Sequence, residues 1–97
     1  ISSCRSSFHD RLQDTHGNYG YSASKIALNM FTFRSLYDLP NNVRTFAVHP
    51  GDVKTDMNPD GKDLPIEQAS RIVGITKNWK DEFNGKFLNY DGTLYPL

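Results

Sequence analysis

The run Val43-Arg-Thr-Phe-Ala-Val-His49 constrains the fold of this chain more than any other stretch. It is rich in β-branched and apolar residues and is stopped by Pro50-Gly51. Such a run is typical of a buried strand in a parallel sheet. Parallel strands are joined by crossover connections, which are usually helices. The segments before and after this run are therefore expected to be helical.

A helix of about 17 residues is predicted before the strand. Its apolar residues repeat at helical spacing and form a wide stripe: Ala23, Ile26, Ala27, Met30, Phe31 and Phe33, with Leu36 and Tyr37 later. Asn18 or Gly20 is expected to cap its start. The helix should end near Asp38, because Pro40 disfavours helix at the residue before it. The stripe is too wide for one neighbouring element to cover.

A second helix is predicted after the strand, and it should begin at Pro65, because proline suits the first helical position. Residues of one face repeat at helical spacing, namely Ile66, Ala69, Ile72, Val73 and Thr76, and Trp79 and Phe83 are expected to extend this apolar face. Asn84-Gly85 indicates a turn, and Lys86–Tyr90 indicates a last short strand. At the other end of the chain, Ile1 and the two serines after it are typical of a strand that runs into a loop.

The order strand end, helix, strand, helix, strand predicts an α/β fold with a parallel sheet. Ninety-seven residues make one small domain or part of a larger one. Residues 4 to 18 are mostly polar and predict a loop longer than most connections. Residues 52 to 64 are predicted to be a loop or short helical turns.

Composition excludes several classes of function. Eleven basic and eleven acidic residues cancel, and no basic stripe indicates binding to nucleic acid or to an anionic membrane. No apolar run approaches the roughly 20 residues that span a bilayer, and no secretory signal is seen. The single cysteine, Cys4, permits no internal disulfide and fits a reducing, cytoplasmic compartment. His9, His16 and His49 are widely spaced, so no metal site is expected.

Tyr21 and Lys25 are the residues whose spacing suggests catalysis. Four positions along a helix correspond to about 400° of rotation and about 6 Å of rise, so the two side chains emerge on one face. A lysine cation near a tyrosine favours the phenolate and lowers the tyrosine pKa toward neutrality, which suits a general acid. A surface tyrosine and lysine on an amphipathic helix would show the same short pattern.

Three further groups of residues are predicted to lie near this pair. Ser2 and Ser3 follow the first strand end, residues 49 to 57 follow the second strand, and residues 85 to 92 include the third. The carboxyl ends of parallel strands meet at one edge of a sheet, where ligands bind. The serine pair, the start of the first helix and the Pro50-Gly51 loop are therefore expected at that edge.

Together these motifs resemble the short-chain dehydrogenase/reductase family. Ile-Ser-Ser, Tyr-Ser-Ala-Ser-Lys-Ile-Ala-Leu-Asn and His-Pro-Gly-Asp-Val-Lys-Thr-Asp-Met occur in the family's order. Within the family, the terminal Gly-Lys-Phe-Leu-Asn-Tyr-Asp-Gly makes the chain similar to the sniffer-type carbonyl reductases. The resemblance implies that residues 1–97 form the C-terminal catalytic half of a doubly wound, Rossmann-like dinucleotide-binding domain.

The resemblance also implies roles for individual residues. Tyr21 would be the general acid in carbonyl reduction and the base in alcohol oxidation. Lys25 would lower the tyrosine pKa and bind the ribose hydroxyls of the nicotinamide. Ser3 would donate a hydrogen bond to the substrate oxygen. Tyr21 and Lys25 would thus contact both substrate and cofactor.

The later motif would hold the nicotinamide ring. Pro50 and Gly51 would line its pocket, while the Val53 backbone and the Thr55 hydroxyl would bind its carboxamide. The cofactor would be NAD or NADP, with NADP favoured by the resemblance, and the substrate a small carbonyl compound or alcohol.

Two departures from the family pattern leave questions open. Ser3 lies farther from Tyr21 than is common in the family, and Ser7 is the competing candidate for the catalytic serine. Ser3 is preferred, because a hydroxyl directly after a strand is held by the backbone. Ser6, Ser22 and Ser24 are expected to be structural or solvent-facing.

The second departure is that the family's Gly-x-x-x-Gly-x-Gly loop and catalytic asparagine are not found in these residues. An upstream half of the same protein is therefore the expected partner, and a homo-oligomer is left open. The alternative is a non-catalytic fragment or interaction module that keeps the scaffold. The 97-residue chain alone is expected to be inactive.

Overall fold

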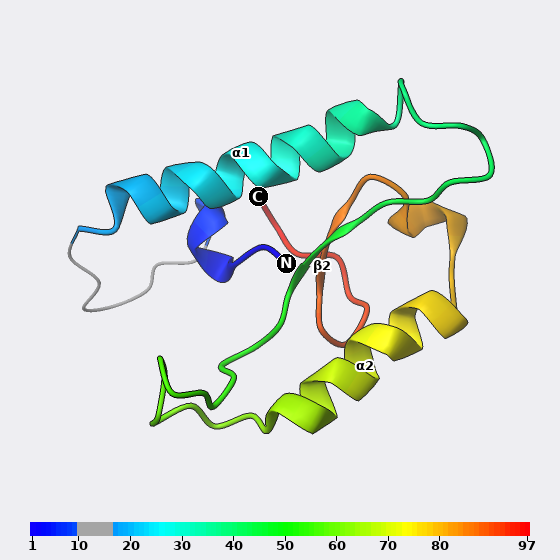
Figure 1. Ribbon diagram of the computed structural model, residues 1–97. Helices are drawn as coiled ribbons and strands as arrows, with labels where there is room; N and C mark the ends of the chain where they lie inside the picture. The colour runs from blue at the N-terminus through cyan, green and yellow to red at the C-terminus, as the bar shows by residue number, and fades with distance from the viewer. Residues whose placement is uncertain (10–16) are drawn as a thin grey trace.

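The computed structural model describes residues 1–9 and 17–97 of the chain (Figure 1). Its elements are η1 (Cys4–Ser6), α1 (Tyr19–Ser35), β1 (Ala47–His49), α2 (Pro65–Lys77), η2 (Asp81–Phe83) and β2 (Phe87–Asn89). The two strands run between α1 and α2 (Figure 1). They pair in parallel, with Val48 opposite Leu88. This confirms the predicted α/β fold and its parallel sheet.

The first residues of the chain lie along the free edge of β1. The Ala47 amide donates to Lys86 O on the β2 side, at 2.9 Å. Because successive residues of a strand point their backbone groups to opposite edges, Val48 faces away from β2. There its carbonyl accepts a 2.7 Å hydrogen bond from the Ser2 amide. Residues 1 and 2 therefore lie where the end of a neighbouring strand was expected, although one hydrogen bond is too few to define a strand there.

The strand predicted over 43–49 is shorter in the structure. Ala47 and Val48 are buried, whereas Val43 is 41% exposed, so the prediction that the whole run is buried on both sides was wrong. The backbone before Ala47 bonds to turns instead of a ladder. Val43 N donates to Pro40 O, and Thr45 N donates to the Asn84 side chain.

Helix α1 has the predicted length of 17 residues but ends at Ser35 and not near Asp38. The next three amides donate to the carbonyls three residues back, which tightens the last turn before Pro40. Asn18, not Gly20, occupies the N-cap position, with a left-handed backbone (φ 61°). Its carbonyl accepts from Ser22 N, while its side chain makes no capping hydrogen bond.

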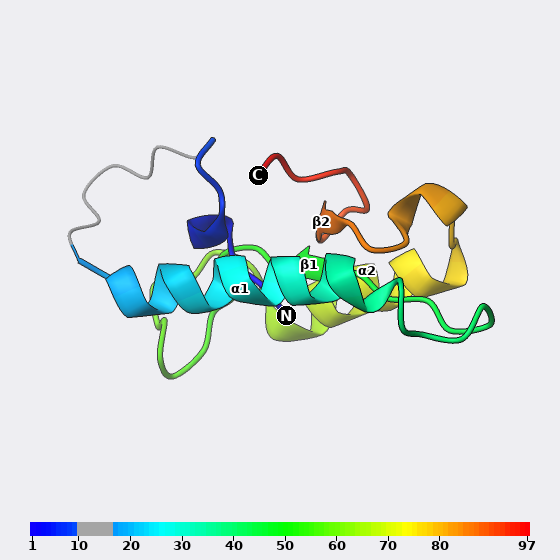
Figure 2. The same cartoon turned by 90° about the horizontal axis from the view of Figure 1, so that it is seen from above.

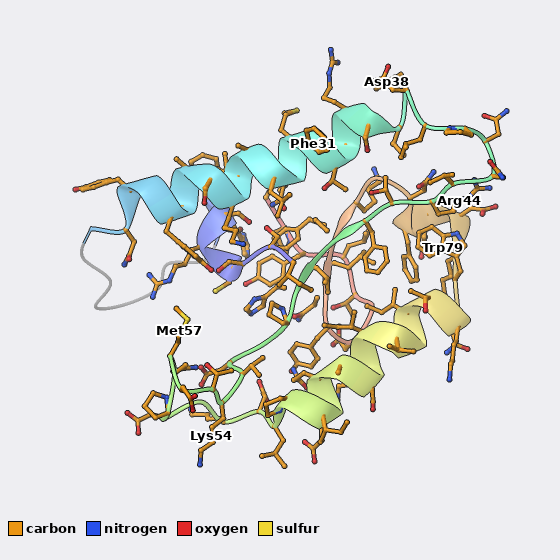
Figure 3. All side chains as sticks on the ribbon, in the orientation of Figure 1. Phe31, Asp38, Arg44, Lys54, Met57 and Trp79 are labelled. Carbon is orange, nitrogen blue, oxygen red and sulfur yellow. The ribbon has the colours of Figure 1, made fainter. Side chains whose placement is uncertain are left out.

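The wide apolar stripe of α1 is largely exposed. The residues of this helix that are buried are Asn29 and Thr32. Met30 is 59% exposed and Phe31 73%, and Figure 3 labels Phe31 on the C-terminal half of the helix. The expectation that one neighbouring element cannot cover this stripe is therefore confirmed.

The apolar core lies between α2 and the sheet. It consists of Val48, Ile75, Phe83 and Leu88, with Phe46, Ile72 and Trp79 packed against it. Phe83 belongs to this core and Trp79, labelled in Figure 3, packs against it, although both lie beyond the end of α2 and so do not extend its apolar face. Most of the predicted apolar face of α2 is instead exposed, including Ile66 at 73%. The residues of this helix that are buried are Gln68 and Ile75.

The predicted loops have more internal structure than the sequence suggested. Residues 4 to 6 form a short 3-10 turn, and residues 10 to 16 of the predicted loop, His16 included, lie outside the described part of the chain. The segment 52 to 64 contains a parallel bridge between Val53 and Asp63.

Seen at right angles to the first view, β1 again lies beside both helices (Figure 2).

Candidate active site

The start of α1 brings Tyr21 and Lys25 together as the helical spacing predicted. The Lys25 ammonium lies 5.6 Å from the centre of the Tyr21 ring. Tyr21 is 47% exposed. The same ammonium donates a 3.0 Å hydrogen bond to the Ile1 carbonyl. Lys25 therefore links the first turns of α1 to the extended segment that carries the two serines.

Ser3 is placed by the backbone immediately after this extended segment. Its own backbone is extended, at φ −154° and ψ 150°, and it caps η1. Its side-chain oxygen accepts a 3.2 Å hydrogen bond from the Arg5 amide. As the acceptor in this bond, the hydroxyl keeps its proton for a second partner. Ser3 is 8% exposed, so its position is well fixed.

A buried polar network lies behind Ser3. The Ser6 hydroxyl donates to the Ser3 carbonyl at 2.6 Å, and Asn29 Nδ2 donates to Ser6 Oγ at 2.8 Å. Ser2 Oγ donates to the Lys25 carbonyl at 3.5 Å. These bonds tie the serine segment to the middle of α1, so Ser6 is structural, as predicted.

Ser7, the competing candidate, is engaged elsewhere. Its hydroxyl donates a 2.6 Å hydrogen bond to the Pro96 carbonyl near the end of the chain. It follows η1 and is not joined to Lys25 or Tyr21 by any hydrogen bond within residues 1–9 and 17–97. Ser7 thus bonds to the C-terminal tail, whereas Ser3 directly follows the extended segment, and the preference for Ser3 stays a prediction.

The Pro50-Gly51 turn begins directly where β1 ends. Gly51 has a left-handed backbone, with φ +90°. A Cβ atom there would collide with Gln68 Nε2 and would stand 2.7 Å from Asp63 Oδ2. The backbone conformation therefore favours glycine, and any other residue would also require the side chains of Gln68 and Asp63 to shift.

Beyond Gly51, the loop that carries Val53 and Thr55 is held by hydrogen bonds to the side chain and the backbone of Asp63. Asp63 Oδ2 accepts from the Asp52 amide at 2.8 Å, and the Lys54 amide donates to the Asp63 carbonyl at 2.8 Å. Thr55 forms an isolated bridge with Asn58. Farther along this loop, Met57 is 98% exposed. Figure 3 shows the side chains of Met57 and Lys54 on the loop. The loop is thus ordered by bonds of its own.

The three expected pieces meet at the carboxyl end of β1. The Ser2 amide bonds to Val48, and the Cys4 amide donates to His49 Nδ1 at 3.3 Å, one residue before Pro50. Lys25 connects the same segment to α1. The serine pair, the helix start and the Pro-Gly turn are therefore neighbours, as the strand order predicted.

Known proteins similar to this chain were found by sequence and by structure. No family model matches the sequence. An uncharacterized oxidoreductase of Schizosaccharomyces pombe is 36% identical over 101 residues, which cover 84% of this chain and 40% of that protein. The protein called C-signal of Myxococcus xanthus is 37% identical over 82 residues, covering 82% of this chain and 49% of its own length. The chain thus spans less than half the length of these relatives.

Two solved structures match the whole chain. Carbonyl reductase Sniffer of D. melanogaster has a TM-score of 0.87 and 33% identity, over 100% of this chain and 39% of that one. An NADPH-bound carbonyl reductase from chicken fatty liver has a TM-score of 0.87 and 30% identity, over 100% of this chain and 41% of that one. The chain belongs to the short-chain dehydrogenase/reductase family. The predicted Rossmann-like fold class is confirmed by the same superpositions.

One residue near the site of this dehydrogenase/reductase chain was missed in the sequence. Gln68 is 2% exposed, and its Nε2 donates a 2.7 Å hydrogen bond to the Pro50 carbonyl. Its polar side chain gave no signal, because a polar residue on a helix is normally assigned to the solvent face. The signal available was its helical spacing with Ile72 and Ile75, which lie on the core side of α2.

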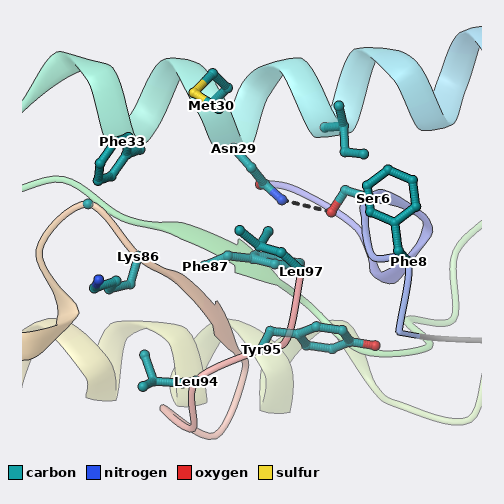
Figure 4. A pocket seen from close by; sticks show the side chains of 12 residues that line it. Ser6, Phe8, Asn29, Met30, Phe33, Lys86, Phe87, Leu94, Tyr95 and Leu97 are labelled. Carbon is teal, nitrogen blue, oxygen red and sulfur yellow. Dashed lines mark hydrogen bonds between the residues drawn. The ribbon is translucent and has the colours of Figure 1, made fainter.

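A pocket of about 720 Å³ lies between α1 and the C-terminal tail (Figure 4). Its walls are mainly apolar and include Phe33, Phe87 and Leu97. Asn29, which holds Ser6, forms part of its lining. Tyr21, Lys25 and Ser3 are not among its lining residues. This pocket is therefore not the expected position of the reacting groups.

The described residues give no sign of a metal centre or a membrane span. No three histidine, cysteine, aspartate or glutamate side chains in this part of the chain are grouped as metal ligands would be. Nor is any helix in it both long and apolar enough to cross a bilayer.

Proposed function

We propose that these residues are the C-terminal catalytic half of an NAD(P)-dependent reductase that interconverts a carbonyl compound and an alcohol. The observation that carries the proposal is the position of the Lys25 ammonium. It lies beside the Tyr21 ring and donates a hydrogen bond to the carbonyl of Ile1, the residue before Ser2 and Ser3. One cation thus joins the proposed proton donor to the strand end that presents Ser3. The identity to two carbonyl reductases, one of them NADPH-bound, supports the reaction class and favours NADP.

The residues present fit the nicotinamide end of such a cofactor. A lysine ammonium has three donors, and the bond to Ile1 uses one, which leaves two for ribose hydroxyls. Val53 and Thr55 lie on the ordered loop after Gly51 and would bind the carboxamide. When bound, a reduced nicotinamide would supply the hydride to the carbonyl carbon and become oxidised.

Two side chains would then act on the substrate oxygen. Ser3 would donate its hydroxyl proton in a hydrogen bond and stabilise the negative charge that develops there. The Tyr21 phenol would transfer its proton to the same oxygen, which completes the alcohol. The positive charge of Lys25 would stabilise the phenolate that remains. In alcohol oxidation each of these transfers runs in reverse.

The rest of the protein belongs to the proposal as well. An upstream half would supply the pyrophosphate-binding loop, and a cytoplasmic location stays a prediction. The non-catalytic alternative predicts a folded protein that keeps these contacts but consumes no reduced cofactor with any carbonyl compound. Assay of the complete polypeptide with both reduced cofactors separates the two.

Exchange of Lys25 for methionine tests its double role. In the complete enzyme, Lys25→Met should weaken cofactor binding about tenfold, because charged hydrogen bonds to the ribose are lost. With saturating cofactor, the pH–rate profile should also move to higher pH, because the phenolate loses its neighbouring cation. Lys77→Met, on the exposed end of α2, is the matched control. A profile that stays in place would leave Lys25 with a structural role only.

The two serine candidates can be separated by a pair of matched variants. Ser3→Ala should lower kcat about tenfold, because one hydrogen bond to the charged oxygen is lost. Ser7→Ala should leave kcat nearly unchanged, since its hydroxyl bonds to Pro96. Steady-state rates at saturating substrate decide the question, and the opposite ranking would transfer the role to Ser7.

A further inference from the structure

The polar side chain of Gln68 is buried where α2 meets the end of β1. At 2% exposure it is among the most buried side chains of the described residues. Burial of an amide is costly unless its hydrogen bonds are satisfied. Here both ends are satisfied: Nε2 donates to Pro50 O at 2.7 Å, and Oε1 accepts from Arg71 Nη1 at 3.0 Å.

The partner of Gln68 is the Pro50 carbonyl, for which no other hydrogen bond is found within residues 1–9 and 17–97. Pro50 follows the last residue of β1 and lacks an amide hydrogen, so its nitrogen cannot take part in a ladder. Next to it, Gly51 has the left-handed backbone that starts the loop toward Val53 and Thr55. A bond at the Pro50 carbonyl therefore fixes the direction in which the loop leaves the sheet.

The turn is enclosed on its other sides as well. The position of a Cβ on Gly51 lies 3.1 Å from the Tyr90 ring, and the Arg71 guanidinium lies 5.3 Å from the centre of that ring. The pKa of Asp91 is lowered mainly by the hydrogen bonds from Thr93, and the positive charge of Arg71 lowers it further. Gln68, Arg71 and Tyr90 thus surround the turn from α2 and from the residue after β2.

We propose that Gln68 is a positioning residue for the cofactor: by holding the Pro50 carbonyl, it sets the course of the loop that would bind the nicotinamide carboxamide. This inference rests on the proposed function for the identity of the ligand. Directly after Gly51, the amide of Asp52 donates a 2.8 Å hydrogen bond to Asp63 Oδ2, so the course set at Pro50 leads straight into the bonds that order the loop.

Gln68→Met keeps the length of the side chain but removes both hydrogen bonds. In the complete protein without cofactor, hydrogen exchange should become at least tenfold faster at the amides of Asp52, Lys54 and Asp63, with exchange in α2 and β2 unchanged. Calorimetric titration with NADPH should give about tenfold weaker binding. Glu67→Gln, at an exposed neighbouring position of the same helix, should change neither.

A second variant keeps the test sharp if Gln68→Met unfolds the protein. Arg71→Met leaves Gln68 in place but removes the bond to its Oε1, and should produce the same loop-specific exchange at about threefold. Faster exchange spread over α2 and β2 would overturn the proposal, because it would show a general packing role. Loop exchange unchanged in both variants would overturn it too. If the unaltered protein does not bind NADPH, the proposed function fails, while the exchange result still decides the role of Gln68.

Discussion

Tyr21→Phe in the complete enzyme should lower kcat about a hundredfold or more, since general-acid catalysis usually contributes this much. The phenyl ring keeps its contact with the Lys25 ammonium, which lies 5.6 Å from the ring centre. The variant therefore removes the transferable proton and little else. Affinity for the cofactor should change little, because Lys25, the proposed partner of the ribose hydroxyls, is unaltered, and the fold should be kept, because Tyr21 is 47% exposed and not part of the buried core.

The matched control is two residues away on the same helix. Tyr19 is 87% exposed at the first position of α1, and Tyr19→Phe should leave kcat unchanged. Rates are measured with saturating NADPH and a carbonyl substrate. If Tyr21→Phe retained most of its turnover, the proton would come from another group and the assignment would be wrong.

The second large effect concerns the 97-residue chain by itself. It should bind neither NADH nor NADPH measurably and should reduce no carbonyl compound. Its residues contain no Gly-x-x-x-Gly-x-Gly loop to bind a pyrophosphate. It also exposes Met30 and Phe31 on α1, and surfaces of this kind promote association.

Calorimetric titration and sedimentation of the purified chain test this expectation together. The complete polypeptide serves as the positive control and should bind the cofactor as a folded protein. For the short chain we expect no heat of binding and a sedimentation profile broadened by association. A compact monomer that binds NADPH tightly would show that the upstream half is not required.

The course of the chain was predictable from local patterns. Pro65 at the first position of a helix, the helical stripe that follows Tyr21 and the short strand that contains Leu88 are all found as expected. Each pattern reflects a local preference of the backbone, so each can be seen in a short window of sequence.

The lateral contacts were less predictable. Val43 looked like part of a buried strand, but the residues before Ala47 bond to turns, and the sequence of 43–49 does not reveal this. Asn29 and Gln68 are buried although they are polar, because each has a particular partner, Ser6 and Pro50. Those partners are distant in sequence, and single-residue preferences carry no information about them.

The candidate site divides in the same way. The spacing of Tyr21 and Lys25 fixed their common face, because helix geometry alone determines it. The preference for Ser3 over Ser7 came from the sequence and stays a prediction; the structure adds the backbone bond from Ser2 to Val48, which shows where the strand end lies. The ordered conformation of the loop around Val53 depends on contacts with Asp63, and no sequence motif indicated these contacts.

The account as a whole is tested most directly by the absorbance of the reduced cofactor. The complete polypeptide is mixed with NADPH or NADH and a panel of aliphatic and aromatic aldehydes and ketones. We predict consumption of reduced cofactor that requires a carbonyl compound, is faster with NADPH, yields one alcohol per cofactor oxidised and falls about a hundredfold in Tyr21→Phe. Folded protein that consumes neither cofactor, or consumes it equally well without Tyr21, would contradict the assignment of these residues to hydride-transfer catalysis.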